Sequence, residues 1–243
     1  MGLCLANPTD QFVDRETLAL VPTPQPTTTW KPVPHIDVVE AVESAIADRG
    51  MHIESERFGL ARDSQKMFGV LTISNHRNNP EWTRCIGIRN SHDQSFAAGI
   101  CCGVSVLVCS NLCFGGEHVL KRRHTSGIDL EVMASDAAAY IEDGFLALEE
   151  HIEELHCRAI RSDDWARSFI CKAAEFGTIP SCDILAVLRE YQNPKHEVFR
   201  TCTQWSLLNA FTETAHKYPP ARFDVCNRRL TRIFGLDGRP AAI

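Results

Sequence analysis

The sequence predicts an α+β fold: an antiparallel strand meander covered by one long helix and followed by a helical C-terminal part. Between residues 53 and 110, short runs alternate apolar with small or polar residues, as strands do. From Leu130 to Leu155 apolar residues recur at steps of three and four, which predicts an amphipathic helix of about seven turns. An antiparallel sheet with one helix-covered face is a stable α+β arrangement. We expect a Pro/Thr-rich arm at 1–34, the α+β core at 35–160 and a helical part packed on it at 161–243.

The first segment is rich in proline. Val21–Pro34 holds five prolines and four threonines. Proline fixes φ and removes a backbone donor, so we expect extended, polyproline-like chain. It either lies over the domain, with Trp30 as its anchor, or serves as a Pro-rich ligand for a groove in another protein. His35–Arg49 then has one apolar face and is followed by Gly50, which predicts the first helix.

Four strands are expected next. Ile53–Ala61 and Met67–Ser74 flank the turn-forming residues 62–65 and predict a hairpin. Arg84–Arg89 predicts a third strand. Gly99–Ser110 predicts a fourth, in which one side carries small residues that would let another segment approach closely.

The long helix is the most regular element of the chain. Its expected inward positions are Leu130, Met133, Ala137, Ile141, Phe145, Leu148, Ile152 and Leu155. Acidic residues in its first turn and basic ones near its end match the helix dipole. The sequence therefore predicts that one face of this helix covers the sheet.

Shorter helices complete the chain. Ser162 is expected to cap one helix whose inward residues are Trp165, Phe169, Ala173 and Phe176. Ser181 is expected to cap a second one, with Ile184, Leu185 and Leu188 inward. Thr203–Lys217 predicts a third helix, with Trp205, Leu208, Phe211 and Ala215 on one face. Phe223–Phe234 predicts a last short, arginine-rich helix.

Composition excludes several classes of protein. The 243 residues carry a formal net charge of −6, so a uniformly basic nucleic-acid coat is excluded, although local basic patches are not. No apolar run approaches the roughly 20 residues that span a bilayer, and the N-terminus does not read as a secretion signal. Eleven cysteines contain no C-x-x-C pair. We therefore expect a cytoplasmic protein without a membrane partner, whose cysteines are thiols.

One set of residues resembles a metal site. Cys109, Cys113, His118 and His124 are four zinc-type ligands within sixteen residues. Their spacing matches no standard zinc finger, and Cys109 lies in an apolar strand, where a buried thiol is ordinary. We expect core thiols and solvent-exposed histidines, hence no cofactor, with structural zinc as the alternative.

The run Asn90, Ser91, His92 and Asp93 is the candidate ligand-contacting turn. Asn, Ser and Asp side chains hydrogen-bond nearby backbone groups, so the simpler interpretation is a structural turn. A cysteine nucleophile near His92 and Asp93 is the enzymatic alternative, with Cys101, Cys102 and Cys109 as candidates. No phosphate-binding glycine loop and no acid–base pair is recognisable, so an enzyme is the least supported class.

Two basic runs are the candidate anion-binding residues. They are Lys121, Arg122, Arg123 and His124, and in the last helix Arg228, Arg229 and Arg232 together with Arg222. Guanidinium and ammonium groups bind phosphate oxygens, and a basic run just before a helix gains from its positive N-terminus. Phe114 or Trp30 would stack bases. The alternative is that these charges are solvated and offset the many acids.

Five segments together resemble a family of phage- and plasmid-encoded proteins classed as a domain of unknown function (number nine-three-two). The segments are WKPVPHIDVVEAV from Trp30, RNSHDQS from Arg89, VCSNLCFGG from Val108, the basic run ending at His124, and TQWSLLNAFTETAHK from Thr203. Their order and spacing extend over most of the chain. His92 stands where that family often has an aromatic residue. The resemblance implies a mobile-element origin in a bacterial host cell and one α+β domain, but no reaction.

These observations lead to two functional hypotheses. In the first, the protein is a nucleic-acid-associated binding module, because the strand-then-helix order is similar to that of annealing recombinases that form rings on single-stranded DNA. Contact would run through the sheet edge and the basic run, and a homo-oligomer is a candidate state. In the second, the protein is a non-enzymatic effector that binds a host protein or nucleotide to counter host defence.

Overall fold

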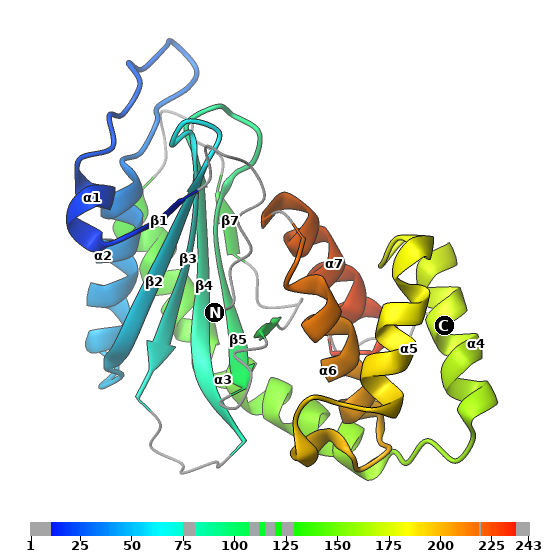
Figure 1. The fold of residues 1–243 in the computed structure, drawn as a ribbon. Coiled ribbons are helices and arrows are strands. Elements are labelled where there is room, and N and C mark those ends of the chain that lie inside the picture. Colours follow the sequence, from blue (N-terminus) through cyan, green and yellow to red (C-terminus); the bar gives the residue numbers. More distant parts are fainter. Residues whose placement is uncertain are drawn as a thin grey trace.

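A seven-stranded antiparallel sheet forms the centre of the α+β part (Figure 1). The computed structural model describes residues 11–74, 81–106, 112–114, 120–122, 129–218 and 220–236. The strands are β1 (Gln11–Val13), β2 (Ile53–Ala61), β3 (Lys66–Ile73), β4 (Trp82–Ser91), β5 (Ala98–Val106), β6 (Leu112–Phe114) and β7 (Leu120–Arg122). Strands β1 to β6 are neighbours in that order, and β7 pairs with the other half of β5. The predicted meander is thus confirmed.

The β2–β3 hairpin turns where the sequence predicts, at residues 62–65. Arg62, Asp63 and Ser64 all have positive φ, at 54°, 53° and 64°. Three consecutive left-handed residues without a glycine are uncommon. The turn is followed directly by a strict in/out alternation of burial along β3, which fixes the register of the sheet.

Two helices cover one face of this sheet. They are α2 (His35–Ala47) and α3 (Leu130–Cys157), which lie side by side behind it in Figure 1. All the inward residues predicted for α3 are buried except Leu130, which is half-buried. The core between sheet and helices includes Phe58, Met67, Ile86, Ile100 and Phe145. The fold class predicted from the sequence is therefore correct.

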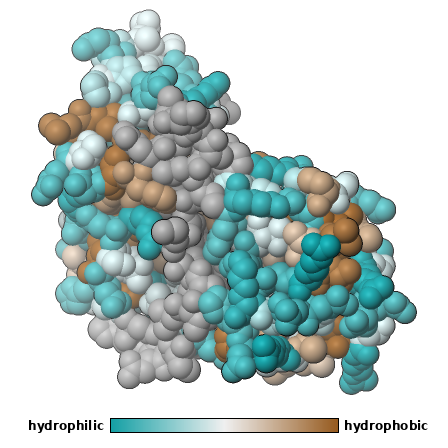
Figure 2. Space-filling view, viewed as in Figure 1, coloured by the Kyte–Doolittle hydropathy of each residue, from teal (hydrophilic) through white to brown (hydrophobic). Residues whose placement is uncertain are grey.

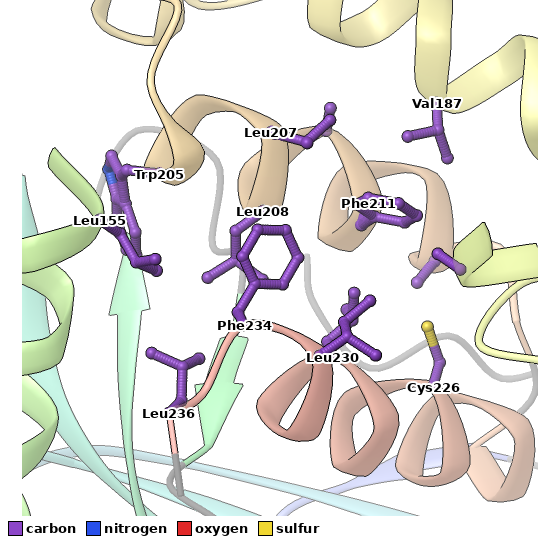
Figure 3. Close-up of a cluster of buried hydrophobic side chains, with 14 of the residues drawn as sticks. Leu155, Val187, Trp205, Leu207, Leu208, Phe211, Cys226, Leu230, Phe234 and Leu236 are labelled. Carbon is purple, nitrogen blue, oxygen red and sulfur yellow. The ribbon is translucent and has the colours of Figure 1, made fainter. Parts of the chain in front are cut away.

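Helix α3 also reaches a second core. Its residues up to Phe145 pack with the sheet, whereas Leu148, Ile152 and Leu155 pack with the helical part. That part consists of α4 (Asp163–Glu175), α5 (Ile184–Gln192), α6 (Gln204–Ala215) and α7 (Pro220–Ile233). Figure 3 shows Leu155 of α3, Val187 of α5, Phe211 of α6 and Leu230 of α7 converging in this core. One helix thus joins both cores.

Three predicted core positions in the helical part are wrong. Trp165 and Phe176 are 42% and 43% exposed, because α4 buries the neighbouring face of Ala166, Phe169, Ile170 and Ala173. Leu185 is 60% exposed. The turn from Ser181 to Asp183 is a 3-10 helix and α5 begins only at Ile184, so the buried residues are Val187 and Tyr191. A three-residue turn shifts the phase of the helix that follows it.

The N-terminal segment contains two elements that the sequence did not predict. Strand β1 pairs with β2 at the sheet edge, and α1 (Arg15–Ala19) follows it. Arg15 fastens this segment by ion pairs to Glu43 of α2 and Glu56 of β2, at 2.7 and 2.6 Å. The elements are short and depend on these tertiary contacts, which local patterns do not encode. No helix in the described ranges is long and apolar enough to cross a membrane.

Candidate functional site

Two of the segments that resemble the family, WKPVPHIDVVEAV and RNSHDQS, meet at one end of the sheet, through residue pairs 55 or more positions apart. The carbonyl of Val33 accepts two hydrogen bonds, from Asn90 Nδ2 at 2.9 Å and from His92 Nε2 at 2.8 Å. Asn90 and Ser91 form the end of β4, so the predicted turn begins only at His92. Val33 is 4% exposed and Trp30 is half-buried, which makes Val33 the better-buried anchor of the arm.

Two histidine rings complete this contact. His35 accepts from Asn90 Nδ2 at Nδ1, at 2.9 Å, and donates from Nε2 to the carbonyl of Ser64 at 3.0 Å. The rings of His35 and His92 stack with centroids 3.8 Å apart and planes 5° from parallel. Because a carbonyl only accepts, the Nε2 atom of each ring carries the proton. The described contacts thus use both ring nitrogens of His35 but only Nε2 of His92.

Burial disfavours the charged form of His92. His35, Asn90 and His92 are 1%, 0% and 3% exposed. Burial lowers the pKa of His92, and the opposing effects of the Val33 hydrogen bond and the Asp93 charge do not cancel it. Among the described residues, His92 Nδ1 and Asn90 Oδ1 have no hydrogen-bond partner. We call His35, Asn90 and His92 the histidine cluster; it ties the arm, α2 and the β2–β3 turn to the sheet.

The opposite face of the same sheet end carries cations and aromatic rings. Met67 and Asn90 face the helices, so the adjacent residues Phe68 and Arg89 face away from them, and they are directly paired. Phe96 lies on this side, 5.5 Å from the Phe68 ring. Arg89 Cζ and Lys66 Nζ lie 5.2 and 5.6 Å from the centre of the Phe96 ring. We call Lys66, Phe68, Arg89 and Phe96 the cation–aromatic cluster.

Hydrogen bonds and ion pairs hold the bend that carries Phe96. The hydroxyl of Ser91 donates to the carbonyl of Phe96 at 2.8 Å and accepts from its N–H at 3.3 Å. Asp93 pairs with Arg62 at 3.2 Å and with Lys66 at 3.6 Å. Burial opposes ionisation of Asp93, but hydrogen bonds from Ser95 and the nearby cations outweigh it and lower its pKa. Two cations, Arg62 and Lys66, therefore share one carboxylate.

The first basic run lies in register with the cation–aromatic cluster across the sheet. Arg89 pairs with Gly99 of β5, and Gly99 pairs with Lys121 of β7. Strand β7 also contacts α3, as expected if the run precedes that helix. However, the Asp129 carboxylate accepts from Val132 N–H at 3.0 Å and already caps the α3 N-terminus. The side chains of Lys121 and Arg122, and all of Arg123 and His124, lie outside the described residues.

Two arginines of the last helix bind backbone carbonyls. Arg229 donates to the carbonyl of Gly177, and Arg222 donates to the same oxygen at 3.2 Å. These bonds satisfy carbonyls after the end of α4. Gly177 has φ +77°, and a Cβ there would collide with Arg229. Arg228 is exposed and Arg232 half-buried, so the second basic run is not one open cationic surface.

The cysteine and metal candidates gain no support from the described residues. Cys109, His118 and His124 lie outside them, as does the side chain of Cys113. Within the described ranges no three or more potential ligands gather as a metal site would require. Burial raises the pKa of Cys102 to about 11, which disfavours a thiolate. Cys101 pairs with Gly87, five residues or roughly 16 Å along the strand from His92.

Acidic side chains are concentrated on the covering helices. Helices α2 and α3 carry eleven Asp and Glu residues and no Lys or Arg. Since the whole chain has a net charge of −6, the remaining residues have a net positive charge. Figure 2 shows the other side of the molecule, where the helical part is mostly hydrophilic with scattered apolar side chains. Anionic ligands are thus repelled from one layer of the fold and favoured elsewhere.

Comparisons with known proteins give a family. No curated protein matches the chain with significance. No solved structure matches it either. The family described as Domain of unknown function (DUF932) matches residues 25–234, which include the last part of the arm, strands β2 to β7 and helices α2 to α7. The chain therefore belongs to the DUF932 family.

Proposed function

We propose that this protein is a nucleic-acid-binding protein of a mobile genetic element, and that a single strand lies against the sheet face that carries the cation–aromatic cluster. The observation that carries the proposal is the cluster itself. Arg89 and Lys66 are held over the ring of Phe96, with Phe68 beside it, on the face opposite the acidic helices. Phosphates would contact the cations, and unpaired bases would pack on the aromatic rings.

The charge pattern supports one orientation of the strand. A polyanion cannot approach α2 and α3, which carry only acidic charged residues, without repulsion. The row Phe68, Arg89, Gly99 and Lys121 crosses the sheet from β3 to β7. A strand that follows this row would meet the cluster first and the basic run Lys121–Arg123 next.

Salt-dependent binding of the full chain to a fluorescent thymidine oligonucleotide tests the proposal. Replacing Lys121, Arg122 and Arg123 by glutamine should weaken binding. It should also make the slope of log K against log salt concentration shallower by about 2. The matched control replaces Arg161, Arg167 and Lys172, which are exposed in and before α4, and should change neither property. Absence of binding, or equal loss in both variants, would rule out the proposed surface.

Phe96 tests the base-stacking part separately. Phe96→Ala should reduce affinity about 5- to 150-fold, because stacking on an aromatic ring contributes about 1–3 kcal/mol per base. Phe176→Ala is the matched control, since Phe176 is a 43% exposed phenylalanine of the helical part. Its affinity should equal that of the wild type.

A second candidate function is an effector that binds a single nucleotide. The compactness of the cluster favours it, because both cations lie within 6 Å of one ring centre. The two functions differ in their dependence on ligand length. A nucleotide binder should bind a mononucleotide as tightly as an oligonucleotide, whereas the proposed strand binder should gain affinity with each added phosphate contact.

A further inference from the structure

The outer face of α3 carries an apolar line that no described residue covers. Val132, Ala139 and Leu146 follow one another at steps of seven and are all exposed. Val132 is 54% exposed and Leu146 is 42% exposed. Residues seven apart lie nearly above one another on a helix, so the line extends over about 21 Å. We call these three residues the α3 seam.

Exposed acids flank the seam. Asp143 and Glu150 lie on one side of it and Glu142 on the other, and Glu153 occupies the next position of the line. The 28 residues of α3 include eight acids and no lysine or arginine. An apolar line between like charges is the pattern by which one helix selects a partner helix of opposite charge.

An acidic groove adjoins the start of the seam. It has a volume of about 490 Å³ and lies between α2 and α3, where its acidic lining residues are Asp37, Glu40, Asp48 and Glu131. Arg49 is the one cation in the lining, and it donates to the carbonyls of Ala45 and Ser135 at 3.2 and 3.4 Å. The groove therefore prolongs the acidic surface beyond the seam.

We propose that the α3 seam docks a cationic amphipathic helix of another protein. Charge complementarity determines this occupant. A second copy of α3 would place acids against acids and is disfavoured. A partner helix with apolar residues every three to four positions and Lys or Arg beside them would cover Val132, Ala139 and Leu146 and pair with the flanking carboxylates. This face is separate from the cation–aromatic cluster, so the proposal does not depend on nucleic-acid binding.

Three synthetic 21-residue peptides test the proposal against the full chain by fluorescence anisotropy. The first has leucine at the seam-facing positions of three heptads and lysine or arginine beside them. The second replaces the basic residues by glutamate. The third has the composition of the first in scrambled order. Only the first should bind tightly, because docking needs both the apolar line and the opposite charge.

Variants of the protein locate the binding. Val132→Ser with Leu146→Ser should weaken binding of the first peptide about tenfold or more. Asp143→Asn with Glu150→Gln should weaken it and reduce its salt dependence. The controls are Leu185→Ser, at a 60% exposed leucine of α5, and Glu54→Gln with Glu175→Gln, at exposed acids elsewhere. No binding, equal binding of the scrambled peptide, or unchanged affinity in the seam variant would overturn the proposal.

Discussion

The two faces of the sheet differ in what they contact, although they alternate along the same strands. Met67 and Asn90 face α2 and α3, within the apolar core and the histidine cluster. Their neighbours Phe68 and Arg89 face the other side, in the cation–aromatic cluster. One residue of offset thus separates a stabilising face from a face with charged and aromatic side chains. At this end of the sheet, substitutions on the first face should affect stability, and substitutions on the second should weaken binding. Further along the strands, Val70 and Cys85 of the second face pack with the helical part.

The largest effect is expected for Phe145 of α3. It is fully buried against the sheet and lies 5.0 Å from the Arg84 guanidinium. Phe145→Ala should lower the free energy of unfolding by about 3–5 kcal/mol, through lost burial and a residual cavity. Urea denaturation measures this. The control is Leu146→Ala at the adjacent, 42% exposed position, which should cost about 0.5 kcal/mol or less. Equal effects at the two positions would contradict the burial of one face of α3 against the sheet.

A smaller effect is expected for the ion pair that ties α3 to the sheet. Arg84 Nε donates to Glu149 Oε1 at 2.6 Å, and both side chains are largely buried, at 21% and 13% exposure. Glu149→Gln should cost about 1–3 kcal/mol, because the charged acceptor of the Arg84 hydrogen bond becomes neutral in a partly buried site. The exposed pair Arg158–Glu154 is the control, and Arg158→Gln should cost about 0.5 kcal/mol or less. Thermal and urea denaturation should rank the two variants in that order.

The histidine cluster should make stability depend weakly on pH. The pKa of His92 is lowered in the folded protein, so the unfolded chain binds more protons below the ordinary histidine pKa of about 6.5. The His92 contribution to stability is therefore complete above that pH and is lost as the pH falls toward the folded pKa. The slope should not exceed about 1.4 kcal/mol per pH unit.

Denaturation of the wild type and of His92→Phe between pH 5 and 8 measures this contribution. The stability difference between the two proteins should change in the wild type's favour as the pH rises, and it should level off above about 6.5. Subtracting the two curves also removes the effect of His216, whose pKa is lowered by burial too. A difference that does not vary with pH would mean that His92 titrates normally in the folded state.

The sequence predicted the elements that repeat a pattern for long enough. Helix α3 repeats its apolar period over 28 residues, and the β2–β3 hairpin combines alternation with a recognisable turn. Strand β1, with three residues, and α1, with five, are too short for any periodicity and depend on Arg15 and the sheet edge. Trp165 and Leu185 are large and apolar but exposed, because residue type alone does not fix which helix face is buried.

The candidate site was predicted in part. The run from Asn90 to Asp93 was recognised, but its partners Val33 and His35 lie 55 or more residues away and are brought to it only by the fold. The cation–aromatic cluster was missed. Strand alternation places Lys66 and Phe68 on one side of β3, and the short turn at 62–65 sets that strand's register. These two of the four cluster residues could therefore have been predicted to share a face. Arg89 and Phe96 join it through the β3–β4 pairing and the bend held by Ser91, which no local pattern reveals.

The most direct measurement compares binding and stability in one variant, Lys66→Gln with Arg89→Gln. Affinity for a thymidine oligonucleotide and the free energy of unfolding are measured on the same preparation, beside the control Arg167→Gln with Lys172→Gln on α4. Our account predicts that affinity falls at least about tenfold in the first variant, because two phosphate-binding cations are lost from the face that holds the strand. It predicts an unfolding free energy within about 1 kcal/mol of the wild type in the control, and a loss of about 1–3 kcal/mol in the first variant, which gives up the partly buried Lys66–Asp93 pair but stays folded in the binding assay. Unchanged affinity in the first variant, or an equal loss in the control, would contradict the assignment of nucleic-acid binding to this face of the sheet.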